Sequence, residues 1–308
     1  MKVVALSGGV GGARLLDGLA RALPPGSMTA IVNTGDDFVH LGMNVSPDLD
    51  TVMYTLAGLA HEERGWGLAE ETFAGLAMVK RYGGPDWFGL GDRDLATHLL
   101  RTEALRAGEP LSAITSRLCR ALGVEQPVLP MSDQPVATMI ETTSEGTLPF
   151  QQWFVRRRAE PAVRAVRYDG GRTPAPGVMD AIDACDLVVF GPSNPYVSVD
   201  PILCLDGVRE AIGRKPVVAL SPIVGGAAIK GPLATMIREL TGEAASAGAV
   251  ARHYGGLVRA MVVERGDEPT VASIPLLGVL GTSTIMRSRD DRLRLAQEIL
   301  AFSTEVKR

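Results

Sequence analysis

A strand, a glycine-rich turn and a helix follow one another at the start of the chain, and this order most constrains the fold. The apolar run Val3–Leu6 leads directly into the segment SGGVGGAR, after which leucines recur at helical spacing from Leu15 to Leu23. A second short apolar run, Thr29–Asn33, comes after this helix. Strand, helix and strand in this order form the first unit of a doubly wound parallel sheet.

Later segments continue the alternation of strands and helices. Buried strands are predicted at Asp186–Phe190, Lys215–Leu220 and Arg259–Val263, and a final helix is predicted from near Asp290. Apolar and polar residues alternate in PVATMIETT and LPFQQWFV, so residues 127–155 are predicted to be rich in strands.

Residues 49–125 differ from the rest, because four segments in this range carry apolar residues at helical spacing. We therefore predict a mainly helical insertion after the second strand. The predicted fold class is α/β, with a Rossmann-like, mostly parallel sheet and helices on both of its faces. The whole chain, residues 1–308, is predicted to form a single domain.

Composition restricts the partners and the compartment. The net charge of −4 gives no basic field to attract nucleic acid, and no apolar run is long enough to span a bilayer. The cysteines Cys119, Cys185 and Cys204 are far apart and odd in number, which favours a reducing compartment without disulfides. We expect a cytoplasmic protein with small-molecule partners and with neither nucleic acid nor membrane as a partner.

The glycines of SGGVGGAR predict an anion-binding turn. Glycines between a strand and a helix let the backbone approach a ligand, and the first N–H groups of the helix favour phosphate. The segment lacks the Lys-Ser/Thr of a Walker A loop, and Arg14 stands where a dinucleotide fingerprint has its third glycine. A tight structural turn is the alternative interpretation.

The segment Asn33–Thr51 gathers four carboxylates directly after the second predicted strand, at Asp36, Asp37, Asp48 and Asp50. Carboxylates at a strand end are costly unless a cation or a hydrogen-bond donor meets them, and Mg²⁺ takes such oxygen ligands together with phosphate. Some of these residues have a simpler interpretation, since Ser46, Asp48 or Asp50 is also suited to cap the helix that follows.

Three other segments carry polar side chains at predicted strand or helix ends. Asp92, Arg93 and Asp94 begin a predicted helix, where Asp92 is suited to cap and Arg93 to hold a phosphate or a carboxylate. GPSNPYVS and the loop from Ser221 follow strands, and their hydroxyls, amide and glycines suit a base, a ribose or a phosphate. No Ser/His/Asp or Cys/His set and no zinc spacing is present.

Six motifs occur in one order: GGVGGAR, NTGDD, SPDLDT followed by YTLAG, WFGLGDRDLATH, PMSD and GPSNPYVS. Across nearly the whole chain this order resembles the CofD family, the 2-phospho-L-lactate transferases of coenzyme F-420 biosynthesis. The resemblance implies a Rossmann-like, Mg²⁺-dependent transferase that is typically a homodimer. Its acceptor would be the deazaflavin Fo, whose terminal hydroxyl attacks a phosphorylated three-carbon acid carried on a GMP-diphosphate donor. GMP would leave, and a phosphodiester would form.

The resemblance also implies roles for individual residues. The catalytic residues would be Asp50, Asp37 and Arg93. Fo would contact Thr34, Asp36, Asp50 and Arg93, and the metal would be held by Asp36 and Asp50. The guanosine diphosphate part would contact Gly9, Gly11, Gly12, Ser193, Asn194 and Ser221.

Two alternatives and one question stay open at this point. The CofD superfamily also contains gluconeogenesis-factor-like regulators, which bind a nucleotide sugar without catalysis, but the chain resembles these less well. The hypothesis of a nicotinamide dehydrogenase is weakened at two positions. Arg14 replaces the third glycine of the fingerprint, and Asn33 stands where a ribose-binding acid would close the second strand. The donor acid is phospholactate, phosphoenolpyruvate or 3-phosphoglycerate, and a bacterial composition favours phosphoenolpyruvate.

Overall fold

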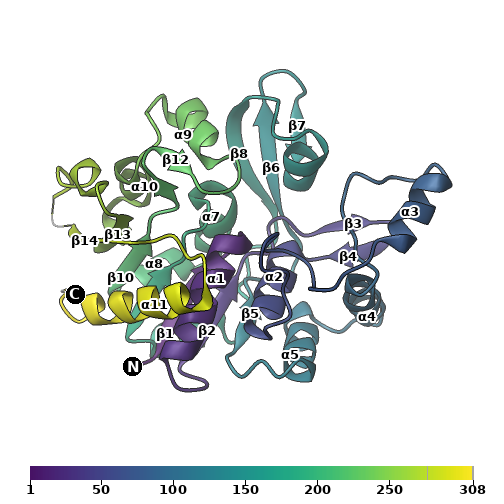
Figure 1. Cartoon of the computed structure of the whole chain (residues 1–308), viewed down its shortest axis with the longest axis horizontal. Helices are drawn as coiled ribbons and strands as arrows, with labels where there is room; N and C mark the ends of the chain where they lie inside the picture. The colour runs from purple at the N-terminus through teal and green to yellow at the C-terminus, as the bar shows by residue number, and fades with distance from the viewer. Residues whose placement is uncertain (276, 307–308) are drawn as a thin grey trace.

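A parallel sheet runs through the centre of the molecule (Figure 1). The computed structural model describes residues 1–275 and 277–306. Seven parallel strands form the sheet in the order β14-β13-β10-β9-β1-β2-β5. Their bounds are β1 Val3–Ser7, β2 Met28–Val32, β5 Val128–Pro130, β9 Leu187–Phe190, β10 Val217–Leu220, β13 Ala260–Glu264 and β14 Gly278–Thr282. The predicted Rossmann-like α/β class is confirmed.

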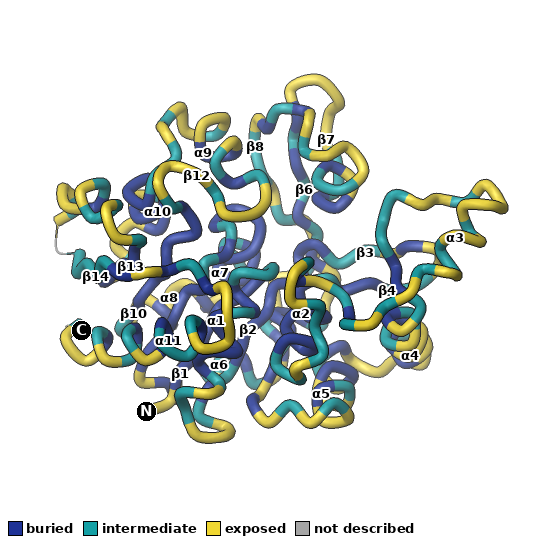
Figure 2. Tube along the Cα trace, viewed as in Figure 1, coloured by how far each residue is buried: buried dark blue, intermediate teal, exposed yellow. Residues whose placement is uncertain are grey.

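Helices cover both faces of this sheet because its strands are apolar on both sides. Alternate residues of β1 enter two separate buried clusters, with Val3 and Ala5 on one face and Val4 and Leu6 on the other. Helices α1 (Gly9–Ala22) and α11 (Arg289–Ser303), together with residues from the segment between β2 and β5, supply the first cluster. The second cluster is supplied by α6 Val178–Ala184, α7 Asp200–Leu203, α8 Val208–Gly213, α9 Leu233–Thr241 and α10 Ala247–Tyr254. Figure 2 shows the central strands and their flanking helices as the most buried part of the trace.

The chain between β2 and β5 contains the four predicted helices and one hairpin that was not predicted. The helices are α2 Pro47–Leu56, α3 Ala74–Arg81, α4 Asp94–Arg106 and α5 Leu111–Ala121. The hairpin pairs β3 (Phe38–His40) with β4 (Met43–Val45) and, with α3, extends away from the sheet (Figure 1). Its turn has φ of +50° at Leu41 and +77° at Gly42, and leucine at positive φ gives no turn signal in the sequence.

A second, antiparallel sheet joins β7 (Thr147–Pro149), β6 (Val136–Thr142) and β8 (Val163–Gly170) in that order. Short strands β11 (Ile223–Val224) and β12 (Ala227–Ala228) form a further pair. The predicted strand in LPFQQWFV is wrong beyond Pro149, because residues Gln152–Arg156 form a π-helical turn. Phe150 contacts the rings of Trp153 and Phe154, three and four residues later, so the burial follows a helical and not a strand period. Among the described residues, no helix combines the length and the apolar character needed to cross a membrane.

Helices α1 and α11 approach most closely at Gly18. A Cβ at this position would lie 2.1 Å from the carbonyl oxygen of Arg292 on α11, which is backbone and cannot rotate away. We expect Gly18→Ala to lower the free energy of unfolding by about 2 kcal/mol, although alanine favours helix by about 1 kcal/mol. The matched control is Gly213→Ala at the end of α8, where the nearest atom would be 3.7 Å away. Urea unfolding of both variants checks this, and equal stability of the two would contradict it.

Candidate functional site

A cavity of about 630 Å³ lies at the carboxyl ends of the central strands. Its wall contains residues from the loops that follow four strands: Gly8 after β1, Asp36 after β2, Ser193 after β9 and Ser221 after β10. This is the edge at which open α/β sheets bind ligands, because the loops there are free to vary. Helices α2 and α4, the π-helical turn and the loops before α9 and α11 close the remaining sides.

The cavity brings together most of the residues proposed from the sequence. The predicted residues that line it are Gly9, Gly11, Asp36, Asp50, Ser193, Asn194 and Ser221. The predicted residues that are not part of its lining are Gly12, Thr34, Asp37 and Arg93. The glycine turn and the acidic segment therefore line the same cavity as the later strand-end loops, although these loops are far away in the sequence.

Asp48 occupies the N-terminal end of α1. Its Oδ1 accepts a hydrogen bond of 2.6 Å from the backbone N–H of Gly9, the first residue of the helix. A side chain at Gly8 has no room, since its Cβ would lie 2.5 Å from Asp48 Oδ2. A Cβ at Gly12 would lie 2.3 Å from Ser7 Oγ, so this glycine is required for packing. The anion that meets this helix end is therefore a carboxylate of the chain itself.

The expected helix cap in the acidic segment is not formed. Ser46 is the N-cap residue of α2, but its side chain makes no capping bond and its Oγ donates to Asp37 Oδ2 at 2.6 Å. Asp48 bonds to Gly9, and Asp50 pairs with Arg101. The interpretation of one of these residues as a plain cap is wrong, because each side chain has a partner outside its own helix.

Asn33 holds two carboxylates side by side at the end of β2. Its Nδ2 donates to Asp36 Oδ1 at 3.0 Å and to Asp48 Oδ2 at 2.9 Å. Gln151 supplies a further amide donor to Asp36 at 3.0 Å. Burial, followed by the charges of Asp48 and Asp37, raises the pKa of Asp36 well above its usual range. Burial likewise raises the pKa of Asp48 to about 6, although Asn33 and Gly9 oppose this shift.

Asp37, the next residue along the chain from Asp36, is a third carboxylate here and is partly buried. Burial raises its pKa well above the ordinary value, against the hydrogen bond from Ser46 and the charge of Arg101. The carboxylates at the end of β2 therefore favour either protons or a bound cation.

A second group of charged residues joins α2 to α4. Both carboxylate oxygens of Asp50 bond to the guanidinium of Arg101, and both side chains are buried. The ring of His98 lies between two aspartates, with Nε2 3.2 Å from Asp94 Oδ2 and Nδ1 3.7 Å from Asp50 Oδ2. Asp50, Asp94 and His98 each place one potential ligand atom within 4.8 Å of the others.

Tyr54 completes this group by donating its hydroxyl to Asp94 Oδ1 at 2.6 Å. Burial raises the pKa of Asp94, but the hydrogen bond and charge of His98 and the Tyr54 hydroxyl outweigh it and lower the pKa overall. Tyr54, His98 and Arg101 were not predicted as site residues from the sequence. A signal was present, since Asp94, His98 and Arg101 follow one face of the predicted helix at i, i+4 and i+7.

Arg93 lies outside the cavity. Its side chain is about half exposed, and its Nη1 donates to the carbonyl oxygen of Ala69 at 2.7 Å. The neighbouring Asp92 does cap a helix, but it is α3, through the N–H groups of Ala74 and Gly75, both at 2.9 Å. The first turn of α4 is capped instead by Glu71, which accepts from the N–H groups of Arg93 and Asp94.

Aromatic and basic side chains both line the cavity, and the guanidinium of Arg64 lies 5.2 Å from the centroid of the Trp66 ring. The aromatic residues are Tyr54, Trp66, Phe88, Phe150 and Phe154, and the basic residues are Arg14, Arg64, Lys230 and Arg287. Trp66 lies against Gly89, where a Cβ would come within 3.2 Å of the indole ring. The cavity therefore combines flat apolar walls, buried carboxylates and cationic groups, which suits a ligand pair with a ring system and phosphates.

Comparison with known proteins gives one family. Residues 3–273 match the family described as "2-phospho-L-lactate transferase CofD". The chain belongs to the CofD family. CofD relatives include a protein named phosphoenolpyruvate transferase from Streptomyces griseus, which is 44% identical and aligned over 100% of both chains. A protein of the same name from Thermobifida fusca is 47% identical over 89% of each chain. This CofD protein is therefore a transferase of the family that serves coenzyme F-420 biosynthesis.

Solved structures support the CofD assignment at the level of the fold. Protein BH3568 from Bacillus halodurans superposes with a TM-score of 0.66, covering 97% of this chain and 99% of its own. A second structure of the same protein, described as a member of the UPF0052 family, gives a TM-score of 0.65. Sequence identities of 20% and 19% restrict this likeness to the architecture.

The raised pKa of Asp48 gives a testable pH dependence. The folded protein binds this proton more tightly than the unfolded chain, whose ordinary value is 3.8, so stability falls as pH rises from about 4 to about 6. The loss from this one group is about 3 kcal/mol. We expect Asp48→Asn to reduce the fall, measured as the free energy of unfolding in urea with chelator from pH 4 to 8.

A matched control for this experiment is Asp92→Asn, which removes a carboxylate that bonds to α3 outside the cavity. This variant should keep the fall in stability that the wild-type protein shows. An Asp48→Asn profile parallel to that of wild type would contradict the buried-carboxylate interpretation.

Proposed function

We propose that this protein transfers a phosphorylated three-carbon acid from a GMP-diphosphate donor to the terminal hydroxyl of the deazaflavin Fo. The hydroxyl oxygen forms a bond to the acid-side phosphorus, the anhydride bond to GMP breaks, and GMP leaves with the electron pair. The product is a phosphodiester of Fo, and the hydroxyl proton passes to a carboxylate of the site. We further propose phosphoenolpyruvate as the acid, since the CofD relatives carry that name.

The observation that carries this proposal is that one cavity is lined by three kinds of side chain: polar groups of loops, aromatic rings and carboxylates. The strand-end loops of Ser193, Asn194 and Ser221 supply hydroxyls and an amide for a nucleotide. The aromatic residues Trp66 and Phe88 supply flat surfaces for a tricyclic acceptor. The carboxylates lie with them at the same edge of the sheet, where a phosphorus atom and an attacking hydroxyl would meet.

The carboxylates fit the Mg²⁺ that this family implies. Asp36 and Asp48 offer oxygen ligands of the kind Mg²⁺ prefers, and burial raises the pKa of both carboxyls because it disfavours the charged forms, which the amide donors offset only in part. We propose that these two residues hold the ion. Asp50, the other predicted ligand, is already neutralised by Arg101. When bound, Mg²⁺ would neutralise charge on the phosphate oxygens during transfer.

Asp50 has a separate role in this proposal. It lines the cavity, and the guanidinium of Arg101 holds its carboxylate in one orientation. We propose that Asp50 orients the Fo hydroxyl and accepts its proton. Thr34, Asp37 and Arg93, which the family resemblance also proposed, act from outside the cavity lining, by supporting the carboxylates or the loops.

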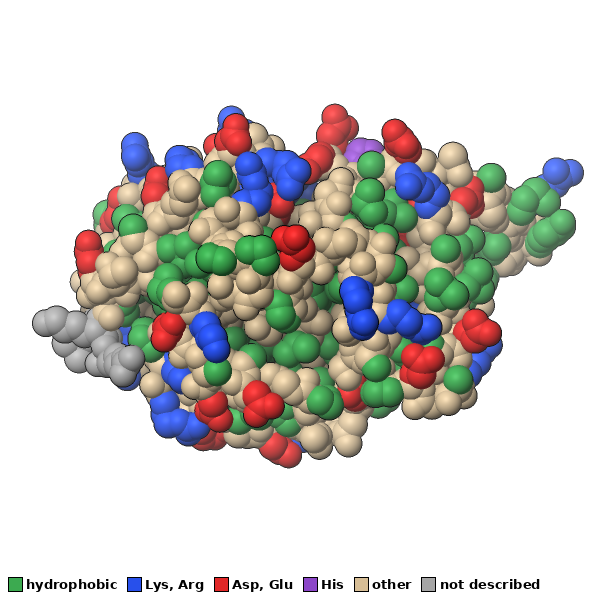
Figure 3. All heavy atoms as spheres, turned by 90° about the horizontal axis from the view of Figure 1, so that it is seen from below, with side chains coloured by type: hydrophobic (Ala, Val, Ile, Leu, Met, Phe, Trp, Pro, Cys, Tyr) green, Lys and Arg blue, Asp and Glu red, His purple; other side chains and the backbone are tan. Residues whose placement is uncertain are grey.

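Assembly and compartment are proposed on separate grounds. Large hydrophobic side chains on α3 and α4 are 40–80% exposed. They are Met78 on α3, Tyr82 at its C-terminal end, and Leu99 and Leu100 on α4. Figure 3 shows hydrophobic side chains gathered on the part of the molecule that projects furthest from the sheet. We propose that this surface contributes to a homodimer. The free cysteines, of which Cys119 and Cys185 are buried, accord with a cytoplasmic enzyme.

The donor is tested by offering the three guanylylated acids in competition, with Fo and Mg²⁺, and by identifying the Fo product by mass spectrometry. We expect the enolpyruvyl product to dominate and GMP to appear in equal amount. A dominant lactyl or glyceryl product would show that the donor carries phospholactate or 3-phosphoglycerate instead. If no product forms and titration does not change Fo fluorescence, the proposal of an enzyme is wrong and a regulator is favoured.

The role of Asp50 is tested with Asp50→Asn at saturating Mg²⁺. A positioned general base contributes about 10²–10⁴-fold, so we expect kcat to fall by about 100-fold or more. Asp92→Asn, which lies outside the cavity, should retain the wild-type kcat. A wild-type kcat in Asp50→Asn would remove Asp50 from the chemistry, and thermal unfolding of both variants verifies that the fold is intact.

A further inference from the structure

The loop that carries Asp36 lies directly against the antiparallel sheet β7-β6-β8. On β6, the backbone N–H of Thr138 donates to the carbonyl oxygen of Gly35 at 2.5 Å. A Cβ at Gly35 would lie 2.6 Å from Thr138 Oγ1, so no side chain fits between the loop and the strand. Gln151, two residues after β7, contacts the same loop through its hydrogen bond to Asp36. Strand β6 and the segment after β7 therefore fix the position of this carboxylate.

The remaining strand, β8, contacts a second π-helical turn, Pro195–Val199. The hydroxyl of Tyr168 on β8 donates to the carbonyl oxygen of Tyr196 in this turn. The next carbonyl oxygen along the chain, that of Val197, accepts from Asn33 Nδ2 at 3.2 Å. Two neighbouring carbonyl groups of one turn thus meet the antiparallel sheet and the amide that holds the carboxylates. Single π-helical turns of this kind are frequent at functional sites.

Thr138 and Tyr168 are directly opposite each other in the register of β6 and β8. Opposite residues of an antiparallel pair project from the same face of the sheet, with their Cβ atoms about 4.5–5.5 Å apart. One member of this pair contacts the loop of Asp36, and the other contacts the turn that leads to Asn33. The pair therefore fixes the loop and the turn relative to each other. Neither residue lines the cavity, so the pair acts on it only through other residues.

The amide of Asn33 depends on this arrangement because it has more acceptors than hydrogens. Its Nδ2 carries two hydrogens and lies within 3.2 Å of three oxygens, which belong to Asp36, Asp48 and the carbonyl group of Val197. Its Oδ1 accepts from the N–H of Gly35 at 2.8 Å, which fixes the orientation of the amide. Displacement of the turn would remove the neutral acceptor and change how the two carboxylates share the amide.

We propose that Tyr168, together with its cross-strand partner Thr138, is a positioning residue that keeps Asp36 and Asp48 at the separation needed to bind a divalent cation. A role of that cation in phosphoryl-type transfer rests on the proposed function, whereas the positioning rests on the hydrogen bonds of the antiparallel sheet. Loss of a partner outside the ligand shell typically weakens metal binding by about 10–100-fold. Tyr168 acts through Asn33, so we expect an effect at the lower end of this range.

The experiment is titration of the purified protein with Mn²⁺, which probes the cation site and is followed by the electron paramagnetic resonance of free Mn²⁺. Tyr168→Phe removes only the hydroxyl and should weaken Mn²⁺ binding about tenfold. Gly35→Ala displaces the loop from Thr138 and should weaken binding at least as much. Thermal unfolding of both variants verifies that they are folded at the temperature of the titration.

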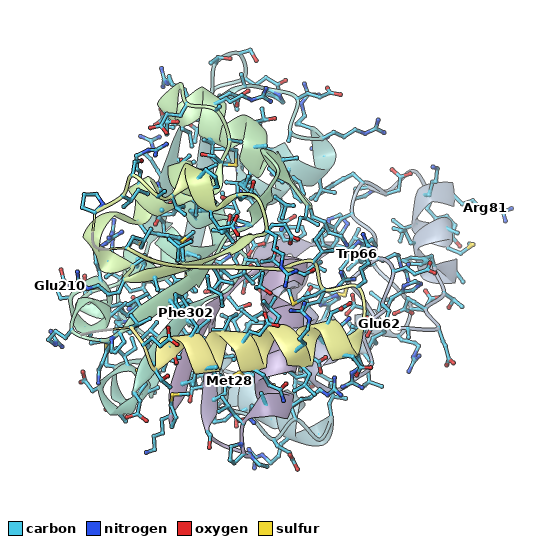
Figure 4. The ribbon with its side chains drawn as sticks, turned by 60° about the vertical axis from the view of Figure 1, so that its left-hand side comes forward. Met28, Glu62, Trp66, Arg81, Glu210 and Phe302 are labelled. Atoms are coloured by element: carbon cyan, nitrogen blue, oxygen red, sulfur yellow. The ribbon has the colours of Figure 1, made fainter. Side chains whose placement is uncertain are left out.

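Two control variants separate this effect from general ones. Tyr254→Phe removes a hydroxyl from α10 but retains the ring contacts with Phe190 and His253, and it should bind Mn²⁺ as wild type does. Glu210→Gln removes an exposed carboxylate of α8 and measures the contribution of surface carboxylates to Mn²⁺ binding. Figure 4 shows Glu210 at the edge of the molecule, away from Trp66 of the cavity wall.

Transfer kinetics provide a second readout that a purely structural role would not produce. If Tyr168→Phe lowers only the affinity for the cation, excess Mg²⁺ should restore most of its kcat, whereas a general loss of packing would not respond to Mg²⁺. Weakened Mn²⁺ binding in Tyr168→Phe, with no Fo product from wild type, would support the positioning and contradict the proposed function. Wild-type Mn²⁺ affinity in Tyr168→Phe, or no Mn²⁺ binding by the wild-type protein, overturns the inference.

Discussion

The side-chain amide of Asn33 holds together the buried carboxylates at the carboxyl end of the sheet. By donating to Asp36 and Asp48 together, it keeps two carboxylates enclosed and adjacent at the end of β2. Asp48 extends this arrangement to α1 through the N–H of Gly9, so the second strand and the first helix are joined by one carboxylate. Because burial disfavours their charged forms, these groups are stable only with protons or a cation, and the surrounding cavity is where such a partner would enter.

Charges of both signs line that cavity. The carboxylates Asp36 and Asp48 and the basic side chains Arg14, Lys230 and Arg287 all belong to its lining. The second acidic group, in which Arg101 pairs with Asp50 and His98 separates Asp50 from Asp94, is internally compensated and rigid. A phosphoanhydride bound in this cavity would meet both cationic side chains and a carboxylate that is fixed in orientation. Positioning and electrostatics of this kind suit phosphoryl-type transfer, which needs little covalent participation by the protein.

Predictions from the sequence were accurate wherever burial followed a regular period. The strands near Val3, Thr29 and Asp186 and the four helices between β2 and β5 formed as expected, because their apolar spacing matches their packing. The hairpin at Leu41 and the π-helical turn at Trp153 were missed or misassigned. Leucine carries no turn preference, and aromatic residues near Trp153 fit a strand period in sequence while contacting each other at helical spacing.

By itself, the sequence determined the α/β class, the family and the edge of the sheet at which the cavity lies, because local spacing and motif order depend on neighbouring residues alone. Only the tertiary structure decided what each polar side chain does. It placed Arg93 outside the cavity and Arg101 against Asp50, and it turned Asp48 from a proposed cap into the partner of Gly9. The reason is that the packing of helices and strands decides which groups a buried charge meets. Asp48 and Arg101 each meet a partner on another element, and sequence spacing does not predict which elements pack together.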